Sequence, residues 1–136
     1  MKHLLIILSI LLLSSPVIGN NHKGDTLYGW GEYPDYIWKG VGEKGTHPLY
    51  KGEVENGVPN GQGTLTSPDR RKYVGDFKDG VPYGQGTFTF LDGWKYFGSW
   101  KNGEIWNGTE YDKYGNIIYR WVNGKRKYHN LNVKFR

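Results

Sequence analysis

Cysteine is absent from the 136-residue sequence. A small fold stabilised by disulfide bonds, a zinc site with cysteine ligands and a lipoprotein anchored through an acylated cysteine are therefore excluded. Stability has to come from packing instead. Aromatic residues make up 16% of the chain and can supply that packing, whereas disordered chains are poor in them.

Long hydrophobic runs are lacking after the N-terminus. Residues 4–13 are almost entirely apolar, but this run is too short for a membrane span of about 20 residues. Because Lys2 precedes the run, and Pro16 and Gly19 follow it, we predict a secretory signal peptide over residues 1–19, cleaved after Gly19. The mature chain would then be secreted or periplasmic, without a transmembrane span. An uncleaved N-terminal anchor is the alternative.

Clusters of catalytic or metal-binding residues are also lacking. The three histidines of the mature chain are scattered, and no nucleotide-binding loop is present, so we predict no enzyme, no metal and no cofactor. A small glycan hydrolase that uses Glu53 or Asp76 is a less favoured alternative, because carboxylates on a solvated strand face explain such residues more simply.

Acidic residues are missing from the C-terminal segment. Residues 113–136 contain seven Lys or Arg and no Asp or Glu, whereas residues 20–112 contain ten Lys or Arg and 13 Asp or Glu. This segment predicts a patch that attracts anionic lipid or polymer, with a solubilising tail as the alternative. No nucleic acid partner is expected. The candidate anionic-surface patch consists of Lys125, Arg126, Lys127, Lys134 and Arg136.

An internal repeat occupies the middle of the chain. Residues 50–57 (YKGEVENG) recur as 73–80 (YVGDFKDG) and 96–103 (YFGSWKNG), and the first two copies are 23 residues apart. Between them, residues 61–66 (GQGTLT) recur as 84–89 (GQGTFT). A fixed period of this size indicates a repeat array rather than a globular active-site fold.

Each repeat has the pattern of a β-hairpin. Alternate residues such as Tyr73, Gly75 and Phe77 point to one face of a strand. The Asn-Gly or Asp-Gly pair that ends each first arm tolerates the positive φ of a tight turn. The glycines on the aromatic face are expected to leave room for an aromatic ring from the neighbouring strand.

The repeat resembles the MORN repeat, through the pattern Tyr-x-Gly-x-aromatic-x-x-Gly followed by Gly-x-Gly-x-aromatic and Asp-Gly. Residues 73–95 are the best copy, and residues 50–72 depart from it because Val54 replaces the aromatic residue. The third copy, 96–116, is one residue shorter in its loop at residues 103–109, and a partial fourth copy spans 117–125. The resemblance implies a non-catalytic scaffold or attachment module, of a kind sometimes linked to phospholipid binding.

These observations predict an all-β fold, a single-layer array of stacked antiparallel β-hairpins of MORN type with a capping segment at each end. The array covers residues 50–125. Residues 20–49 are expected to form an N-terminal cap with a degenerate half-repeat, which protects the first edge of the sheet. Residues 126–136 are expected to form a basic C-terminal strand or tail.

The aromatic residues of the repeats are predicted to form one continuous stripe on one face of the sheet. Such a stripe is expected to be the core, because the hairpins have no other apolar face to bury. An open groove that holds a sugar, a peptide or a lipid chain is the alternative. The candidate aromatic face consists of Tyr73, Phe77, Phe88, Tyr96, Trp100 and Tyr111.

The sequence therefore predicts an exported, non-enzymatic repeat module that acts as a protein-interaction or attachment scaffold. The alternative is a cell-envelope protein that binds anionic phospholipid or glycan through the basic end and the aromatic face. Asn107, in the triplet Asn107-Gly108-Thr109, is in addition a formal acceptor for N-glycosylation.

Overall fold

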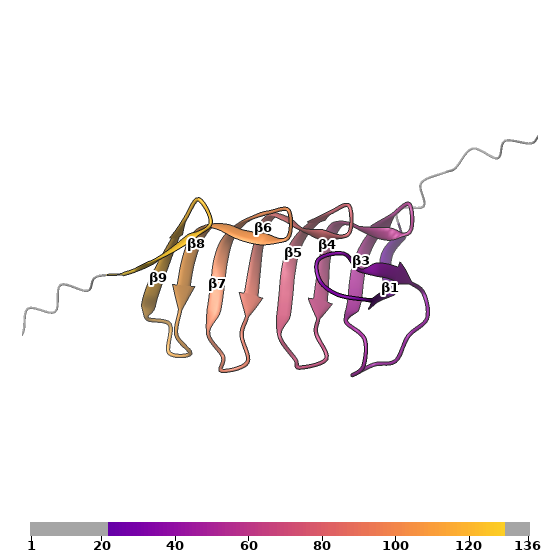
Figure 1. The fold of residues 1–136 in the computed structure, drawn as a ribbon, viewed down its shortest axis with the longest axis horizontal. Helices are drawn as coiled ribbons and strands as arrows, with labels where there is room; N and C mark the ends of the chain where they lie inside the picture. Colours follow the sequence, from indigo (N-terminus) through magenta and orange to yellow (C-terminus); the bar gives the residue numbers. More distant parts are fainter. Residues whose placement is uncertain (1–21, 130–136) are drawn as a thin grey trace, which may run out of the picture.

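The computed structural model describes residues 22–129. Its ten strands form one open antiparallel sheet, and no helix occurs within this range (Figure 1). The order along the sheet is β10-β9-β8-β7-β6-β5-β4-β3-β1-β2, so that strands adjacent in sequence are paired from β3 onward. The predicted all-β array of stacked hairpins is confirmed. The strands are β1 His22–Trp30, β2 Ile37–Lys39, β3 Leu49–Glu55, β4 Val58–Thr66, β5 Lys72–Lys78, β6 Val81–Thr89, β7 Lys95–Lys101, β8 Glu104–Tyr111, β9 Ile117–Val122 and β10 Lys125–Tyr128.

Tight turns join the two strands of each hairpin from β3 to β10. In the turn between β3 and β4, Asn56 has φ 52° and Gly57 has φ 78°. The turns at residues 79–80, 102–103 and 123–124 likewise have two positive φ angles. Two-residue turns of this kind match the right-handed twist of the flanking strands, which is why they connect antiparallel hairpins. The predicted turns are confirmed, and the fourth hairpin continues through β10, beyond the predicted boundary at residue 125.

Longer loops connect one hairpin to the next. They span residues 67–71, 90–94 and 112–116, and each is closed by a backbone hydrogen bond between its first and last residue, such as Ser67 N to Arg71 O at 2.9 Å. An aspartate in each loop accepts a further backbone N–H, as Asp112 does from Tyr114 at 2.9 Å. The short polar side chain thus replaces the ladder hydrogen bonds that the loop lacks.

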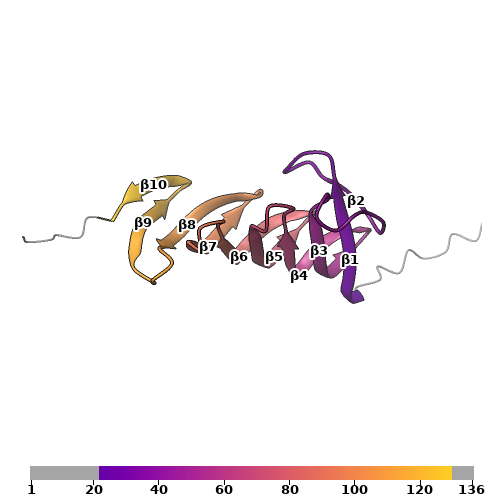
Figure 2. The same cartoon turned by 90° about the horizontal axis from the view of Figure 1, so that it is seen from below.

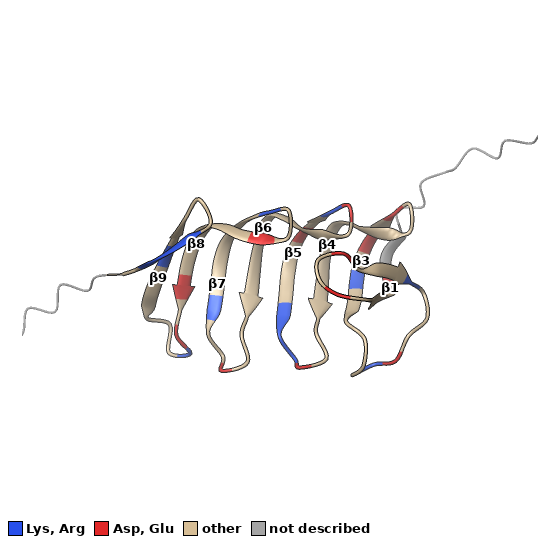
Figure 3. Ribbon diagram, viewed as in Figure 1, with Lys and Arg blue, Asp and Glu red and all other residues tan. Residues whose placement is uncertain are grey.

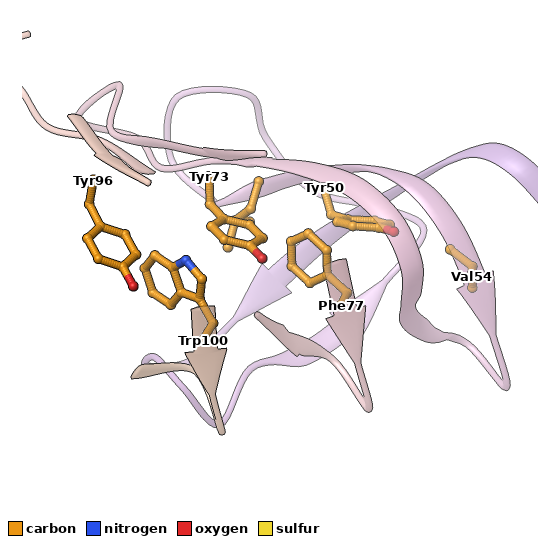
Figure 4. Close-up of a cluster of buried hydrophobic side chains, with 7 residues drawn as sticks. Tyr50, Val54, Tyr73, Phe77, Tyr96 and Trp100 are labelled. Atoms are coloured by element: carbon orange, nitrogen blue, oxygen red, sulfur yellow. The ribbon is translucent and has the colours of Figure 1, made fainter. Parts of the chain in front are cut away.

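One face of the sheet, here called the inner face, carries the core. The burial of β5 and β7 alternates, with the tyrosine, the glycine and the second aromatic residue of each strand buried. In Figure 4, Tyr73 and Tyr96 enter from one side and Phe77 and Trp100 enter from the opposite side, so the rings meet in the middle. The sheet therefore builds a core by curving its own inner face. The buried hydrophobic residues are Tyr50, Val54, Leu65, Tyr73, Phe77, Tyr96 and Trp100.

Each core tyrosine lies against a glycine of the partner strand. A Cβ added at Gly86 would lie 2.3 Å from the Tyr73 ring, and one added at Gly63 would lie 2.3 Å from the Tyr50 ring. The Tyr73 hydroxyl donates a hydrogen bond of 2.7 Å to the Asp76 carbonyl, three residues along its own strand. The expectation that glycines leave room for rings of the neighbouring strand is therefore confirmed.

The N-terminal segment covers the first edge of the repeat array. β1 pairs with β3 and β2 pairs with β1, both antiparallel. Figure 2 shows β1, β2 and their connecting loops rising from one face of the sheet at its N-terminal end. Because β1 satisfies the hydrogen-bonding groups of β3, the edge of the array is protected from unwanted strand addition.

Gly75→Val is expected to lower the free energy of unfolding by about 1 to 3 kcal/mol, because overpacked cores shift backbone and rotamers. A Cβ at Gly75 would lie 2.4 Å from the Gln85 carbonyl oxygen and 2.5 Å from Gly86 Cα, and neither backbone atom has room to move. Thr87→Ala, on the opposite face, is expected to cost less than about 1 kcal/mol. Denaturant melts of both variants measure this, and equal losses would contradict the assignment of the faces.

Candidate binding surfaces

Five of the six predicted stripe residues lie on the inner face. Tyr73, Phe77, Tyr96 and Trp100 are buried there, and Phe88 packs partly buried against them. The rings meet edge to face, for example Tyr73 and Trp100 at 4.9 Å between centroids and 76° between planes. This geometry is the favourable one for aromatic pairs.

The sixth residue, Tyr111, is on the opposite face, here called the outer face, so its assignment to the stripe is wrong. In the β7–β8 ladder, Tyr111 is paired with Lys95, and Tyr96 is paired with Glu110. The second arm of the third copy begins one residue earlier than the 23-residue period predicts. The residue equivalent to Phe88 is therefore Glu110, and not Tyr111, which lies 23 residues after Phe88. Because side chains alternate along a strand, this shift of one residue exchanges the faces.

Glu110 thus occupies the place that Leu65 and Phe88 hold opposite their tyrosines in the first two hairpins. It is 2% exposed. Trp121 Nε1 donates a hydrogen bond of 3.0 Å to Glu110 Oε2, and Arg126 forms an ion pair of 2.5 Å with Oε1. A buried carboxylate needs such partners because its desolvation is costly. The sequence signal for this cluster was an acidic residue at a position where the other copies are apolar.

The predicted anionic-surface patch is divided by this arrangement. Arg126 is bound to Glu110, and its guanidinium lies 3.6 Å from the centroid of the Tyr119 ring. Lys125 and Lys127 are exposed, and because they alternate with Arg126 on β10 they belong to the outer face. Lys134 and Arg136 lie outside the described residues. Arg126 is therefore a structural residue as well as a surface charge.

Residues 31–39, here called the N-terminal strap, cross the inner face of the first hairpins. The Tyr33 hydroxyl donates a hydrogen bond to the Gly103 carbonyl, and burial raises the pKa of Tyr33 to about 12. The Trp38 ring meets the Tyr50 ring edge to face at 6.0 Å between centroids. Since the strap supplies a second layer here, the N-terminal part of the aromatic stripe is a closed core.

The inner face is open beyond the strap. A hollow of about 430 Å³, here called the C-terminal groove, lies over the last two hairpins. Trp121 and Ile105 in its wall are only partly buried, although both pack against the core. The stripe is therefore closed at one end and open at the other. The lining residues are Phe88, Trp100, Gly103, Glu104, Ile105, Trp121 and Gly124.

The carboxylates considered for a hydrolase support the backbone. Asp76 Oδ2 accepts the backbone N–H of Gln85 at 2.9 Å, and Glu53 accepts that of Gln62 in the same position of the preceding hairpin. Ser99 Oγ accepts the N–H of Asn107 at 3.1 Å in the third hairpin. All three bonds are made where the register of the hairpin shifts, so these side chains pair N–H groups that the ladder leaves unpaired.

Asn107, the predicted glycosylation acceptor, is exposed on β8. Its side-chain Oδ1 accepts the backbone N–H of Asn123 at 2.7 Å, which links the third hairpin to the turn of the fourth. Within residues 22–129, no group of three or more His, Asp or Glu side chains is arranged to hold a metal ion. In the same range no helix is long and apolar enough to cross a membrane.

The fold and its surfaces define a protein of the antiparallel β-hairpin repeat class. The family model of the MORN repeat matches residues 50–70, 73–95 and 96–106, and the chain is a MORN-repeat protein. The third match ends at Trp106, shortly before the residues where the short copy places Glu110 on the inner face. No curated protein matches the chain. MORN repeats commonly mediate interactions with proteins or membrane lipids.

Arg126→Gln is expected to lower the free energy of unfolding by about 1 to 3 kcal/mol, because the buried Glu110 carboxylate loses its charged partner. Adding Glu110→Leu to this variant is expected to restore most of the loss, since Leu65 occupies the same position in the first hairpin. Thermal or denaturant melts of the single and double variants measure both effects. Lys127→Gln, on the outer face, is the control, and an equal effect of the two single variants would show that the ion pair is not structural.

Proposed function

We propose that the protein is a non-enzymatic scaffold that holds an extended segment of a partner protein in the C-terminal groove. The observation that carries this proposal is the unequal covering of the inner face. The strap covers the inner face over the first hairpins, whereas Phe88, Trp100 and Trp121 line an open hollow over the last ones. Of these, Phe88 and Trp121 are only partly buried, and aromatic side chains often anchor a binding partner.

The membership in the MORN family supports the same proposal, because interaction with proteins or lipids is common among such repeats. The groove offers mainly apolar walls, with Glu104 as the charged residue in its lining. A partner segment with apolar side chains would bury this surface and gain about 25 cal/mol for each Å² removed from water. The export of the protein is part of the proposal and rests on the sequence of residues 1–19, which lie outside the described residues.

Ile105→Ser is expected to reduce capture of the partner by about tenfold or more, since a polar hydroxyl replaces an apolar wall of the groove. The measurement is a pulldown from the native source with residues 20–136 as bait, in which bands retained by the unaltered chain are compared between variants. Phe97→Ser is the matched control, because Phe97 is 57% exposed on the outer face. Retention of the partner by Ile105→Ser together with a normal melt would contradict the assignment of the groove.

Anionic lipid is a second candidate ligand, and the composition of the outer face favours it. Phe97 is 57% exposed there, between Thr87 and Thr109 of the neighbouring strands. Figure 3 shows basic segments recurring on β3, β5 and β7 and again toward the C-terminal end of the sheet. Exposed Lys and Arg near an anionic membrane contribute about 1 kcal/mol each. The basic residues on the outer face of strands β3 to β10 are Lys51, Lys72, Lys78, Lys95, Lys101, Arg120, Lys125 and Lys127.

The lipid candidate predicts that the mature chain sediments with vesicles that contain anionic lipid, and not with neutral vesicles, at low ionic strength. Binding should fall steeply with salt, because exposed charges are screened over about 8 Å at physiological ionic strength. The double variant Lys125→Gln/Lys127→Gln should bind less, whereas Lys39→Gln/Lys44→Gln, in the N-terminal segment, should bind as before. Arg126 is left unchanged because it holds Glu110. Equal binding to neutral vesicles would contradict the lipid candidate.

A further inference from the structure

A second cavity lies beneath the N-terminal strap, with a volume of about 190 Å³. Tyr33 and Tyr36 of the strap form one wall, and Tyr73, Phe88 and Trp100 of the sheet form the opposite wall. It adjoins the C-terminal groove and shares Phe88, Trp100 and Gly103 with it, but the strap residues belong to this cavity only. The cavity is therefore a small aromatic chamber, distinct in shape from the open groove.

Trp100, which lines this chamber, carries a buried hydrogen-bond donor without a partner. Trp100 is 7% exposed, and within the described residues no group accepts a hydrogen bond from its Nε1. Figure 4 places the indole nitrogen on the side of the ring that faces Tyr73, which also lines the chamber. The previous hairpin has Phe77 at this position, which carries no such donor. Because buried donors in native proteins are nearly always paired, the unpaired N–H points to an acceptor supplied by a ligand.

A positively charged side chain, Arg71, lies at the edge of the same chamber. The Arg71 side chain is 49% exposed, with Nε bound to Asp69 at 2.8 Å. Burial raises the pKa of the Tyr36 phenol, which lines the same chamber; the positive charge of Arg71 opposes that rise and the negative charge of Asp69 adds to it. The guanidinium of an arginine has four further N–H donors on its two terminal nitrogens, and these can donate hydrogen bonds to a carboxylate.

The size and the walls of the chamber limit what it can hold. An apolar protein cavity of about 150 Å³ is known to take benzene, so about 190 Å³ suits one six-membered ring with a single small substituent. A sugar ring would bring several hydroxyl groups against aromatic walls, where polar groups without hydrogen bonds are costly. We propose that the chamber binds a small aromatic carboxylate, with its ring between the strap and the sheet, its carboxylate toward Arg71 and Trp100 Nε1 donating to it.

The test is a titration of the folded chain, residues 20–136, with sodium benzoate, followed by the indole N–H signals in a ¹H–¹⁵N correlation spectrum. The signal of Trp100 is the one that disappears in Trp100→Phe, a variant expected to fold because Phe77 fills the equivalent position. Benzoate at millimolar concentration is expected to shift this signal. Benzyl alcohol, which has a similar ring but no charge, is expected to bind at least about tenfold more weakly.

Arg71→Gln is expected to weaken benzoate binding to the level of benzyl alcohol. Arg70→Gln is the matched control, since it removes the same charge one residue earlier from a side chain that does not line the chamber, and it should leave benzoate binding within about twofold. No shift of the Trp100 signal, equal effects of the two arginine variants, or equal binding of benzyl alcohol would each overturn the proposal. Tighter binding of sodium glucuronate would overturn the aromatic class and indicate a sugar acid instead.

The chamber and the groove share three lining residues, but the chamber proposal is tested separately from the scaffold function. Arg71 lines the chamber but not the C-terminal groove, and Ile105 lines the groove but not the chamber. A loss of partner capture in Ile105→Ser with benzoate binding unchanged would support the groove and the chamber separately. If benzoate does not bind, the chamber proposal is wrong, but the pulldown result on the groove is unaffected.

Discussion

The packing of a tyrosine ring on a glycine of the partner strand is the interaction on which the rest of the structure depends. Tyr50, Tyr73 and Tyr96 are each almost fully buried, and a Cβ at the glycine opposite would overlap the ring at 2.3 to 2.7 Å. Each hydroxyl donates to a carbonyl three residues along its strand, as Tyr96 does to Ser99 at 2.7 Å. The buried phenol is thus paired, as a buried polar group has to be. A single-layer sheet gains a core in this way because its inner face curves around the rings.

The same interaction explains why repeats can be stacked without disulfide bonds. Phe77 meets Tyr50 of the preceding hairpin and Tyr73 of its own strand, at 4.9 and 5.1 Å between ring centroids. Trp100 repeats this arrangement with Tyr73 and Tyr96. Each hairpin therefore buries its aromatic residues against its neighbours, and stability becomes a sum of contacts between adjacent units. This aromatic packing changes at Glu110, where a charged residue occupies a position that is apolar in the first two hairpins. Trp121 and Arg126 of the fourth hairpin donate hydrogen bonds to its carboxylate.

The two ends of the inner face differ because only one of them is covered by the strap. Trp38 and Tyr33 contact the turns at Gly80 and Gly103, so the strap spans two successive hairpins. Beyond Gly103 the described residues provide no second layer, and Trp121 and Ile105 stay partly exposed. A repeat array with one closed and one open end presents a defined binding surface, whereas a uniform array would repeat the same surface along its length. This asymmetry is the physical basis of the scaffold proposal.

The sequence by itself determined the repeated hairpins, the tight turns and the face on which Tyr73, Phe77 and Trp100 lie. These are local properties, because strand alternation and the positive φ of Asn-Gly pairs depend on residues close in the chain. The missing residue in the third copy is visible in the sequence and accounts for the place of Tyr111, whereas only the tertiary structure decided that Glu110 is buried against Trp121 and Arg126. The contact of Tyr33 with Gly103 joins residues 70 positions apart and has no counterpart in the repeat pattern. The chamber beneath the strap depends on that long-range contact, so no local pattern predicted it.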